Sequence, residues 1–314
     1  MFLNIEKYHY RPRKKKKKRW KILAAVILLS ALIAAGWIYR VDRRLRSVMQ
    51  PESQENGLPE LWNNRMYDEI IYRSGELLAK APLDYRALTF KGFSSFYKAV
   101  SKISFEEKIL YLDEAVSSLR LARLSGNSNW SAETAYVLGK AYYHKGKYYF
   151  DLAIRYLEEA LRQGYSGEDI YDYLGLSYTQ LDDRKRGLEY FVLAYKKNPT
   201  DLLMLTMAQN YFQLKMTEEA EEYLIRAINR TDDKAIEEKS RFLLGRLYFE
   251  RGAYFKSENE YQEILELNSR SADAHYYLGE IYLKLNDLVK ARSEWRKALI
   301  IDPSHYGAKL RYYK

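Results

Sequence analysis

The clearest pattern of apolar and polar positions lies between Ala272 and Pro303, where apolar residues recur every three or four positions in two runs. The first run is His275, Leu278, Gly279 and Tyr282, and the second is Leu288, Ala291, Trp295, Ala298 and Leu299. This spacing places each run on one face of a helix, and Asn286 and Asp287 between the runs are typical of a turn. Pro303 cannot continue a helix, so it ends the second one. We therefore predict a helical hairpin whose apolar faces need neighbours to cover them.

The same hairpin pattern recurs upstream with a period of about 34 residues. Its units begin near residues 51, 85, 132, 168, 201, 238 and 272. The five units from residue 132 onward are regular, whereas the unit near residue 51 has a weak first helix. In the unit that begins at residue 85, the spacing from Gly92 to Ala115 is longer than elsewhere. This indicates a longer first helix, or an extra turn inserted between Ser101 and Ser104.

These hairpins resemble the tetratricopeptide repeat, in which Leu, Gly and Tyr on a first helix meet Ala and an aromatic residue on a second. The residues that match this signature are Leu138, Gly139, Tyr142, Gly175, Tyr178, Phe191, Pro199, Ala220, Gly245, Tyr248, Gly279, Tyr282, Ala291, Trp295, Ala298 and Pro303. The small residues mark places where two helices approach closely. The resemblance implies an all-α, right-handed superhelical solenoid, with five regular repeats over residues 132–305 and two degenerate repeats over residues 58–131.

The solenoid is expected to end in a cap and to begin after a membrane anchor. Residues 306–314 are too short for another hairpin, so we predict that Leu310, Tyr312 and Tyr313 cover the last apolar face. Residues 22–39 form an uncharged apolar run, which spans about 27 Å as a helix at about 1.5 Å per residue. Aromatic residues lie at both ends of this run, where interfacial aromatics are found. We therefore predict one transmembrane helix over residues 22–39.

Basic residues flank this apolar run unequally. The arm formed by residues 1–21 carries nine Lys and Arg residues in its last eleven positions, whereas the linker formed by residues 40–57 begins with four arginines and one aspartate. The larger count stays in the cytoplasm, which places the repeats across the membrane, in the periplasm if the membrane is the bacterial inner membrane. A cleaved signal peptide ending near Ala34 to Gly36 is one alternative. A lysine run that binds nucleic acid is another, but we interpret the arm as an orientation signal on anionic lipid.

Charge and composition argue against nucleic-acid binding and catalysis by the repeats. The net charge is +10, but the first 46 residues hold 14 of the 52 Lys and Arg residues and only 2 of the 42 Asp and Glu residues. The rest of the chain is thus nearly neutral, unlike a nucleic-acid-binding surface. Cysteine is absent, the four histidines are scattered, and no phosphate-binding or nucleophile motif occurs. We therefore predict no enzyme activity, no catalytic residue, no cofactor and no metal site.

The resemblance implies that the first helices line a concave groove that takes a peptide or helix of a partner protein. Carried onto this sequence, it gives a set of positions that we call the groove row: Tyr136, Lys140, Tyr143, His144, Leu205, Gln209, Phe212, Phe242, Arg246, Phe249, Tyr276 and Glu280. Asp172, Leu176, Thr179 and Leu283 occupy corresponding places, and Phe93, Phe96 and Tyr97 extend the row if the second unit is regular. Aromatic residues are common interface anchors, and the alternative is that these rings pack between neighbouring units.

These observations lead to one interpretation with two alternatives. The predicted protein is a membrane-tethered scaffold of tetratricopeptide type that binds protein partners on the extracytoplasmic side. Similar architectures occur in bacterial envelope and flagellar-motor assemblies. The alternatives are an adaptor whose repeats face the cytoplasm, and an enzyme whose active site has no recognisable motif.

Overall fold

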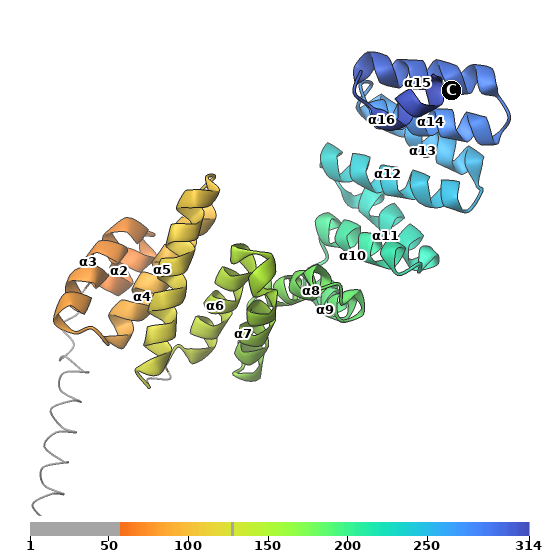
Figure 1. Ribbon diagram of the computed structural model, residues 1–314. Coiled ribbons are helices and arrows are strands. Elements are labelled where there is room, and N and C mark those ends of the chain that lie inside the picture. Colours follow the sequence, from red (N-terminus) through yellow and green to blue (C-terminus); the bar gives the residue numbers. More distant parts are fainter. Residues whose placement is uncertain (1–56, 127–128, 314) are drawn as a thin grey trace, which may run out of the picture.

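The computed structural model describes residues 57–126 and 129–313, which fold into 15 α-helices and one short 3₁₀ helix, with no strand in these ranges. Helices succeed one another along an elongated stack from α2 at one end to α16 at the other (Figure 1). The expectation of an all-α solenoid is confirmed for these residues. The predicted transmembrane helix over residues 22–39 lies outside the described residues. None of the described helices is both long enough and apolar enough to cross a bilayer.

Consecutive helices pack as seven antiparallel pairs within the described ranges. The pairs are α2 (Leu58–Asn63) with α3 (Tyr67–Lys80), α4 (Tyr85–Ser101) with α5 (Phe105–Leu124), α6 (Ser131–Lys145) with α7 (Phe150–Arg162), α8 (Ile170–Gln180) with α9 (Arg184–Lys197), α10 (Asp201–Gln213) with α11 (Thr217–Arg230), α12 (Lys234–Glu250) with α13 (Tyr254–Leu267), and α14 (Ala272–Lys284) with α15 (Leu288–Ile301). The 3₁₀ helix η1 (Lys147–Tyr149) joins α6 to α7. Helix pairs therefore lie at the positions that the apolar spacing predicts.

The hairpin turns share one backbone device. A residue with positive φ follows the first helix in several pairs, as at Lys215 (62°) and Asn286 (61°). The amide three residues after the helix end then donates to the carbonyl of a tyrosine on that helix, from Met216 to Tyr211 at 3.0 Å and from Asp287 to Tyr282 at 2.8 Å. This left-handed ending satisfies carbonyls that the helix end leaves without partners. The tyrosine position is thus fixed relative to the turn.

Close helix approach occurs where glycine faces a large residue of the second helix. A Cβ atom on Gly139 would lie 2.5 Å from Cγ of Leu157, and one on Gly279 would lie 2.4 Å from Nε1 of Trp295. No side chain fits at these distances without displacing its neighbour. In the second pair the same role falls to Gly92, which faces Leu119. The extra residues of that pair lengthen both helices, to 17 residues in α4 and 20 in α5, rather than adding a turn between them.

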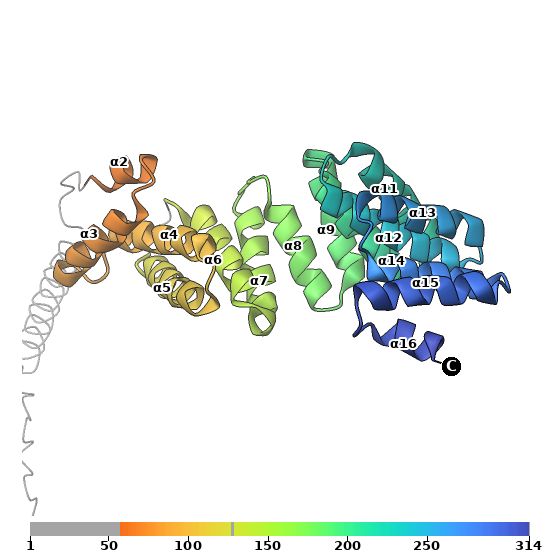
Figure 2. The same ribbon diagram turned by 90° about the horizontal axis from the view of Figure 1, so that it is seen from above.

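The last helix, α16 (Tyr306–Tyr312), lies beside α15 at the carboxy-terminal end (Figure 2). Ala308 is buried there and Tyr312 packs against the same cluster, so the predicted cap is present. The prediction is wrong for Leu310 and Tyr313, which are 43% and 78% exposed. A helix of only seven residues turns one face to α15, and that face carries Ala308 and Tyr312. Arg311 fixes the helix by donating to both carboxylate oxygens of Glu280, at 2.8 and 2.7 Å.

Candidate partner-binding surfaces

The signature residues lie between helices, where a structural role requires them. Thirteen of them are buried: Leu138, Gly139, Tyr142, Gly175, Tyr178, Phe191, Ala220, Gly245, Tyr248, Gly279, Ala291, Trp295 and Ala298. Tyr282 and Pro199 are half-buried, and Pro303 is exposed. The exposed proline follows α15 and stands outside the packing. These residues therefore hold the stack together and leave its surface to other positions.

The groove row divides into buried, half-buried and exposed members. Tyr136, Leu205, Phe212 and Glu280 are buried, as is Phe96 in the predicted extension. Lys140, Tyr143, His144, Phe242, Phe249 and Tyr276 are half-buried, and Gln209 and Arg246 are exposed. Leu205 and Phe212 are each only 3% exposed, so they lie beneath the surface and present almost no area to a ligand. Partner binding by the remaining members stays a prediction.

Several half-buried rings of the groove row are held by rings of the same hairpin, of the next hairpin or, for Tyr276, of the residue that precedes α16. The ring centroids lie 5.1 Å apart for Tyr143 and Tyr173, 5.3 Å for Phe242 and Tyr277, and 4.9 Å for Tyr276 and His305. Phe249 meets Tyr254 of its own hairpin at 5.7 Å. Packing between neighbouring units, the alternative raised by the sequence, thus accounts for part of this aromatic row. The same contacts fix the orientation of the rings that remain partly open.

The charged members of the groove row are largely neutralised or uncharged. Lys140 Nζ lies 2.8 Å from Asp169 Oδ2, donates to Tyr136 Oη at 2.9 Å, and stands over the ring of Tyr173. Burial, together with the positive charges of Lys108 and Lys140, lowers the pKa of His144 to about 4. His144 is therefore neutral at pH 7, where its Nε2 lies 3.1 Å from Tyr173 Oη. Neither side chain offers a free cation to a ligand.

A polar bridge joins successive hairpins at three places. The hydroxyl of the signature tyrosine donates to a glutamate on the second helix of the preceding pair. The three bonds run from Tyr178 to Glu158 at 2.6 Å, from Tyr248 to Glu221 at 2.8 Å, and from Tyr282 to Glu258 at 2.6 Å. We call the surface between one second helix and the next first helix a seam. Buried hydroxyl groups need such partners, so each bridge holds the two helices of its seam together and also satisfies the tyrosine hydroxyl.

The seam between α9 and α10 lacks this bridge. Glu221 and Glu258 each follow the small residue of their second helix, at which the helices approach closely. Glu158 instead follows the large residue of its helix. On α9, the residue after the small position is Leu188 and the residue after the large position is Val192. The hydroxyl of Tyr211 accordingly has no carboxylate to bond across this seam in the described residues. The two helices also pack on each other less extensively than at the other seams.

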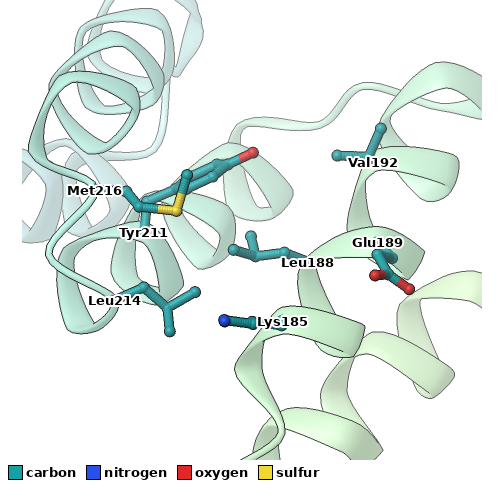
Figure 3. Close-up of a pocket in the computed structure, with 7 residues that line it drawn as sticks. All are labelled: Lys185, Leu188, Glu189, Val192, Tyr211, Leu214 and Met216. Atoms are coloured by element: carbon teal, nitrogen blue, oxygen red, sulfur yellow. The ribbon is translucent and has the colours of Figure 1, made fainter.

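A cavity of about 540 Å³ opens in this seam (Figure 3). Its lining is Lys185, Leu188, Glu189 and Val192 from α9, Tyr211 from α10, and Leu214 and Met216 from the turn after α10. Tyr211 also stacks on Tyr223 of α11 at 5.5 Å, which holds its ring in the wall. Sequence reasoning missed this site because it followed the first helices alone. The available signal was the pair of apolar residues at both seam places of α9.

No metal-binding cluster accompanies these surfaces in the part of the chain that the structure describes. Throughout the described ranges, no three His, Asp or Glu side chains come together in a way that could hold a metal ion. These surfaces present aromatic rings, an apolar cavity and a few charges at its rim.

Comparison with known proteins agrees with this geometry. Models of the tetratricopeptide repeat match residues 203–234 and 242–306. A solved structure, the carboxy-terminal part of a repeat-containing protein from Cytophaga hutchinsonii, covers 81% of this chain and 97% of its own, with a TM-score of 0.64 and 16% identity. At that identity the likeness shows the fold alone. The chain is thus an all-helical solenoid that contains tetratricopeptide repeats.

Two curated relatives are much longer than this chain. Anaphase-promoting complex subunit CDC16 of Saccharomyces cerevisiae is 28% identical over 144 residues, which make up 43% of this chain and 17% of that protein. Superkiller protein 3 of Schizosaccharomyces pombe is 23% identical over an alignment of 266 residues, and the match covers 74% of this chain and 19% of that protein. The matched region spans less than a fifth of either relative.

Proposed function

We propose that this protein is a scaffold that binds partner proteins through its repeats and is tethered to a membrane by residues 22–39. One relative is named as a subunit of a larger complex, which agrees with a role in assembly. The observation that carries the proposal is the set of half-buried rings on the first helices α6, α12 and α14, each held by another ring. Such rings are already ordered before a partner arrives.

Preordered rings reduce the entropy that binding must overcome. A side chain with many rotamers loses about 0.5–1.5 kcal/mol of entropy when an interface immobilises it. Tyr143 and Phe249 are already confined by Tyr173 and Tyr254, so most of that loss has been met in folding. Their remaining open surface is then available as contact area, which aromatic residues supply efficiently at interfaces.

Replacing Tyr143 and Phe249 together by alanine should reduce partner co-purification at least tenfold, because each truncated ring removes on the order of 1 kcal/mol or more of contact energy. The full-length chain would be purified from its native membranes and the bound proteins quantified. Phe212 is left unchanged, since its burial makes alanine there a test of folding.

The matched control replaces Tyr148 and Phe255, which are 79% and 75% exposed and lie outside the groove row. This control variant should keep its partners. Equal recovery of partners by both variants, with unchanged melting curves, would exclude the groove row as the binding surface.

The tether proposal rests on the sequence of residues 1–46, with the arm in the cytoplasm, against anionic lipid, and the repeats across the bacterial inner membrane. In this position the scaffold would serve an envelope or flagellar-motor assembly. The natural chain has no cysteine, so a single introduced thiol reports its own side of the membrane. A cysteine in place of the exposed Tyr148 should react with a membrane-impermeant maleimide in intact spheroplasts. Reaction only after lysis would instead support the adaptor that faces the cytoplasm.

A further inference from the structure

We propose that the cavity in the α9–α10 seam is a docking site for one bulky apolar side chain of a partner protein, carried next to a carboxylate that pairs with Lys185. The proposal rests on the proposed scaffold function but concerns a different surface. The cavity and the groove row share no residue: the row uses Leu205, Gln209 and Phe212 of α10, whereas the cavity uses Tyr211 and the turn that follows.

Both walls of the cavity are apolar. Val192, Tyr211 and Leu214 pack in part on a small cluster that includes Leu188, but above that cluster the walls leave the cavity open. Its volume of about 540 Å³ falls in the usual range of about 300–1,000 Å³ for ligand pockets. Met216 at the rim is 38% exposed, and the methionine side chain adapts readily to different apolar partners.

This seam is not closed by the polar bridge that closes three of the others. At the α11–α12 seam, Glu221 receives both the Tyr248 hydroxyl at 2.8 Å and the guanidinium of Arg251. Three residues after the signature tyrosine, where that unit has Arg251, the α10 unit has Leu214. At the α9–α10 seam, apolar side chains on both helices thus stand in place of these polar contacts. Removing such side chains from water is favourable.

The charge at the opening of the cavity determines which polar group the bound partner should carry. Lys185 reaches toward Leu214 across the opening, whereas Glu189 points away from that wall (Figure 3). The arginines on either side are engaged, Arg184 with Asp182 at 3.1 Å and Arg186 with Asp183 at 2.6 Å. Lys185 has no ion-pair partner within 4.0 Å among the described residues. Glu189, which also lines the cavity, likewise has no ion-pair partner within 4.0 Å among the described residues, but Lys185 is the charge that extends across the opening, and it fits a carboxylate beside the anchor.

The test uses a random twelve-residue peptide library displayed on phage and the full-length chain in detergent. Selection should enrich peptides that share one Leu, Met, Phe or Trp with an Asp or Glu close by. The selected peptides should lose at least tenfold in affinity for Lys185→Glu, and a peptide whose acid is changed to Lys should recover on that variant. Val192→Glu, which places a charge in the cavity, should abolish binding.

Two further variants control for folding. Val289→Glu introduces the same charge at a valine that is 83% exposed on α15, and it should bind normally. Met216→Trp fills the cavity without a charge and should also abolish binding while the melting curve is kept. Peptides that carry no shared acid, prefer a base, or survive both Val192→Glu and Met216→Trp overturn the proposal, as does the absence of any enrichment.

Other outcomes separate this site from the groove row and from self-association. Peptide binding should persist in the variant that lacks Tyr143 and Phe249, so a failure of the groove row leaves the cavity untouched. If the full-length chain dimerises and Val192→Glu alone makes it monomeric, the occupant is a second copy and the proposed partner class is wrong.

Discussion

Replacing Trp295 by alanine should lower the free energy of unfolding of the last repeat by about 3–5 kcal/mol, the usual loss for a large aromatic residue in a core. Trp295 is only 3% exposed and packs in a cluster with Ala291, Ala298 and Ala308. These neighbours are small and belong to helices, so they cannot move in to fill the cavity left by the indole. The loss should lie toward the lower end of the range, because Nε1 is buried without a hydrogen-bond partner and its removal relieves that deficit.

A solenoid can unfold repeat by repeat, so the measurement must be local. Hydrogen exchange of the amides in α14, α15 and α16 should accelerate by the factor that corresponds to the lost stability, with less effect on α6 and α7. Val289→Ala on the same helix is the control, and a change at an exposed position should stay within about 0.5 kcal/mol. A loss below about 1 kcal/mol for Trp295→Ala would show that the indole is not part of a tightly packed core.

The helix pairs could be predicted because each depends on local periodicity. The spacing around Gly279, Ala291 and Trp295 is set by which residues must meet across one hairpin, and that hairpin is continuous in sequence. The turn geometry was less accessible where the left-handed residue is neither glycine nor asparagine, as at Lys215, because such a residue carries a weak signal. The α16 cap shows the same limit: with only seven residues, periodicity does not say which of its sides faces α15.

The exposed surface could be predicted only in part, because it depends on contacts between hairpins. Phe212 and Phe249 occupy the same place in successive units, yet Phe212 is buried and Phe249 is half-buried. Phe212 packs in a buried cluster with residues of α11 and α12, and Arg246 on the next first helix lies over its ring at 5.1 Å. Whether such a ring is buried depends on residues of the next repeat, and the sequence pattern of a single repeat does not include them. The α9–α10 cavity was missed for the same reason, since it becomes visible only when two second helices are compared.

Gly279→Leu should destabilise the same repeat by about 1–3 kcal/mol through overpacking. A Cβ atom at this position would lie 2.4 Å from Nε1 and 2.5 Å from Cδ1 of Trp295, well inside contact distance. The indole cannot retreat, because Ala291, Ala298 and the half-buried Tyr282 pack in the same cluster. Leucine is the better helix former by somewhat less than 1 kcal/mol, so the net loss is what remains after that gain.

A double-mutant cycle would show that the loss at Gly279 comes from the indole. In the Trp295→Ala background the leucine has room, so the combined loss should be smaller than the sum of the two single losses by at least about 1 kcal/mol. Gly75→Leu in α3 is the matched control, since a Cβ there would meet nothing within 4 Å, and it should leave stability unchanged or slightly raised. Additive losses in the cycle, or equal melting curves for the Gly279 and Gly75 variants, would contradict the close approach of α14 to α15 on which the repeat is built.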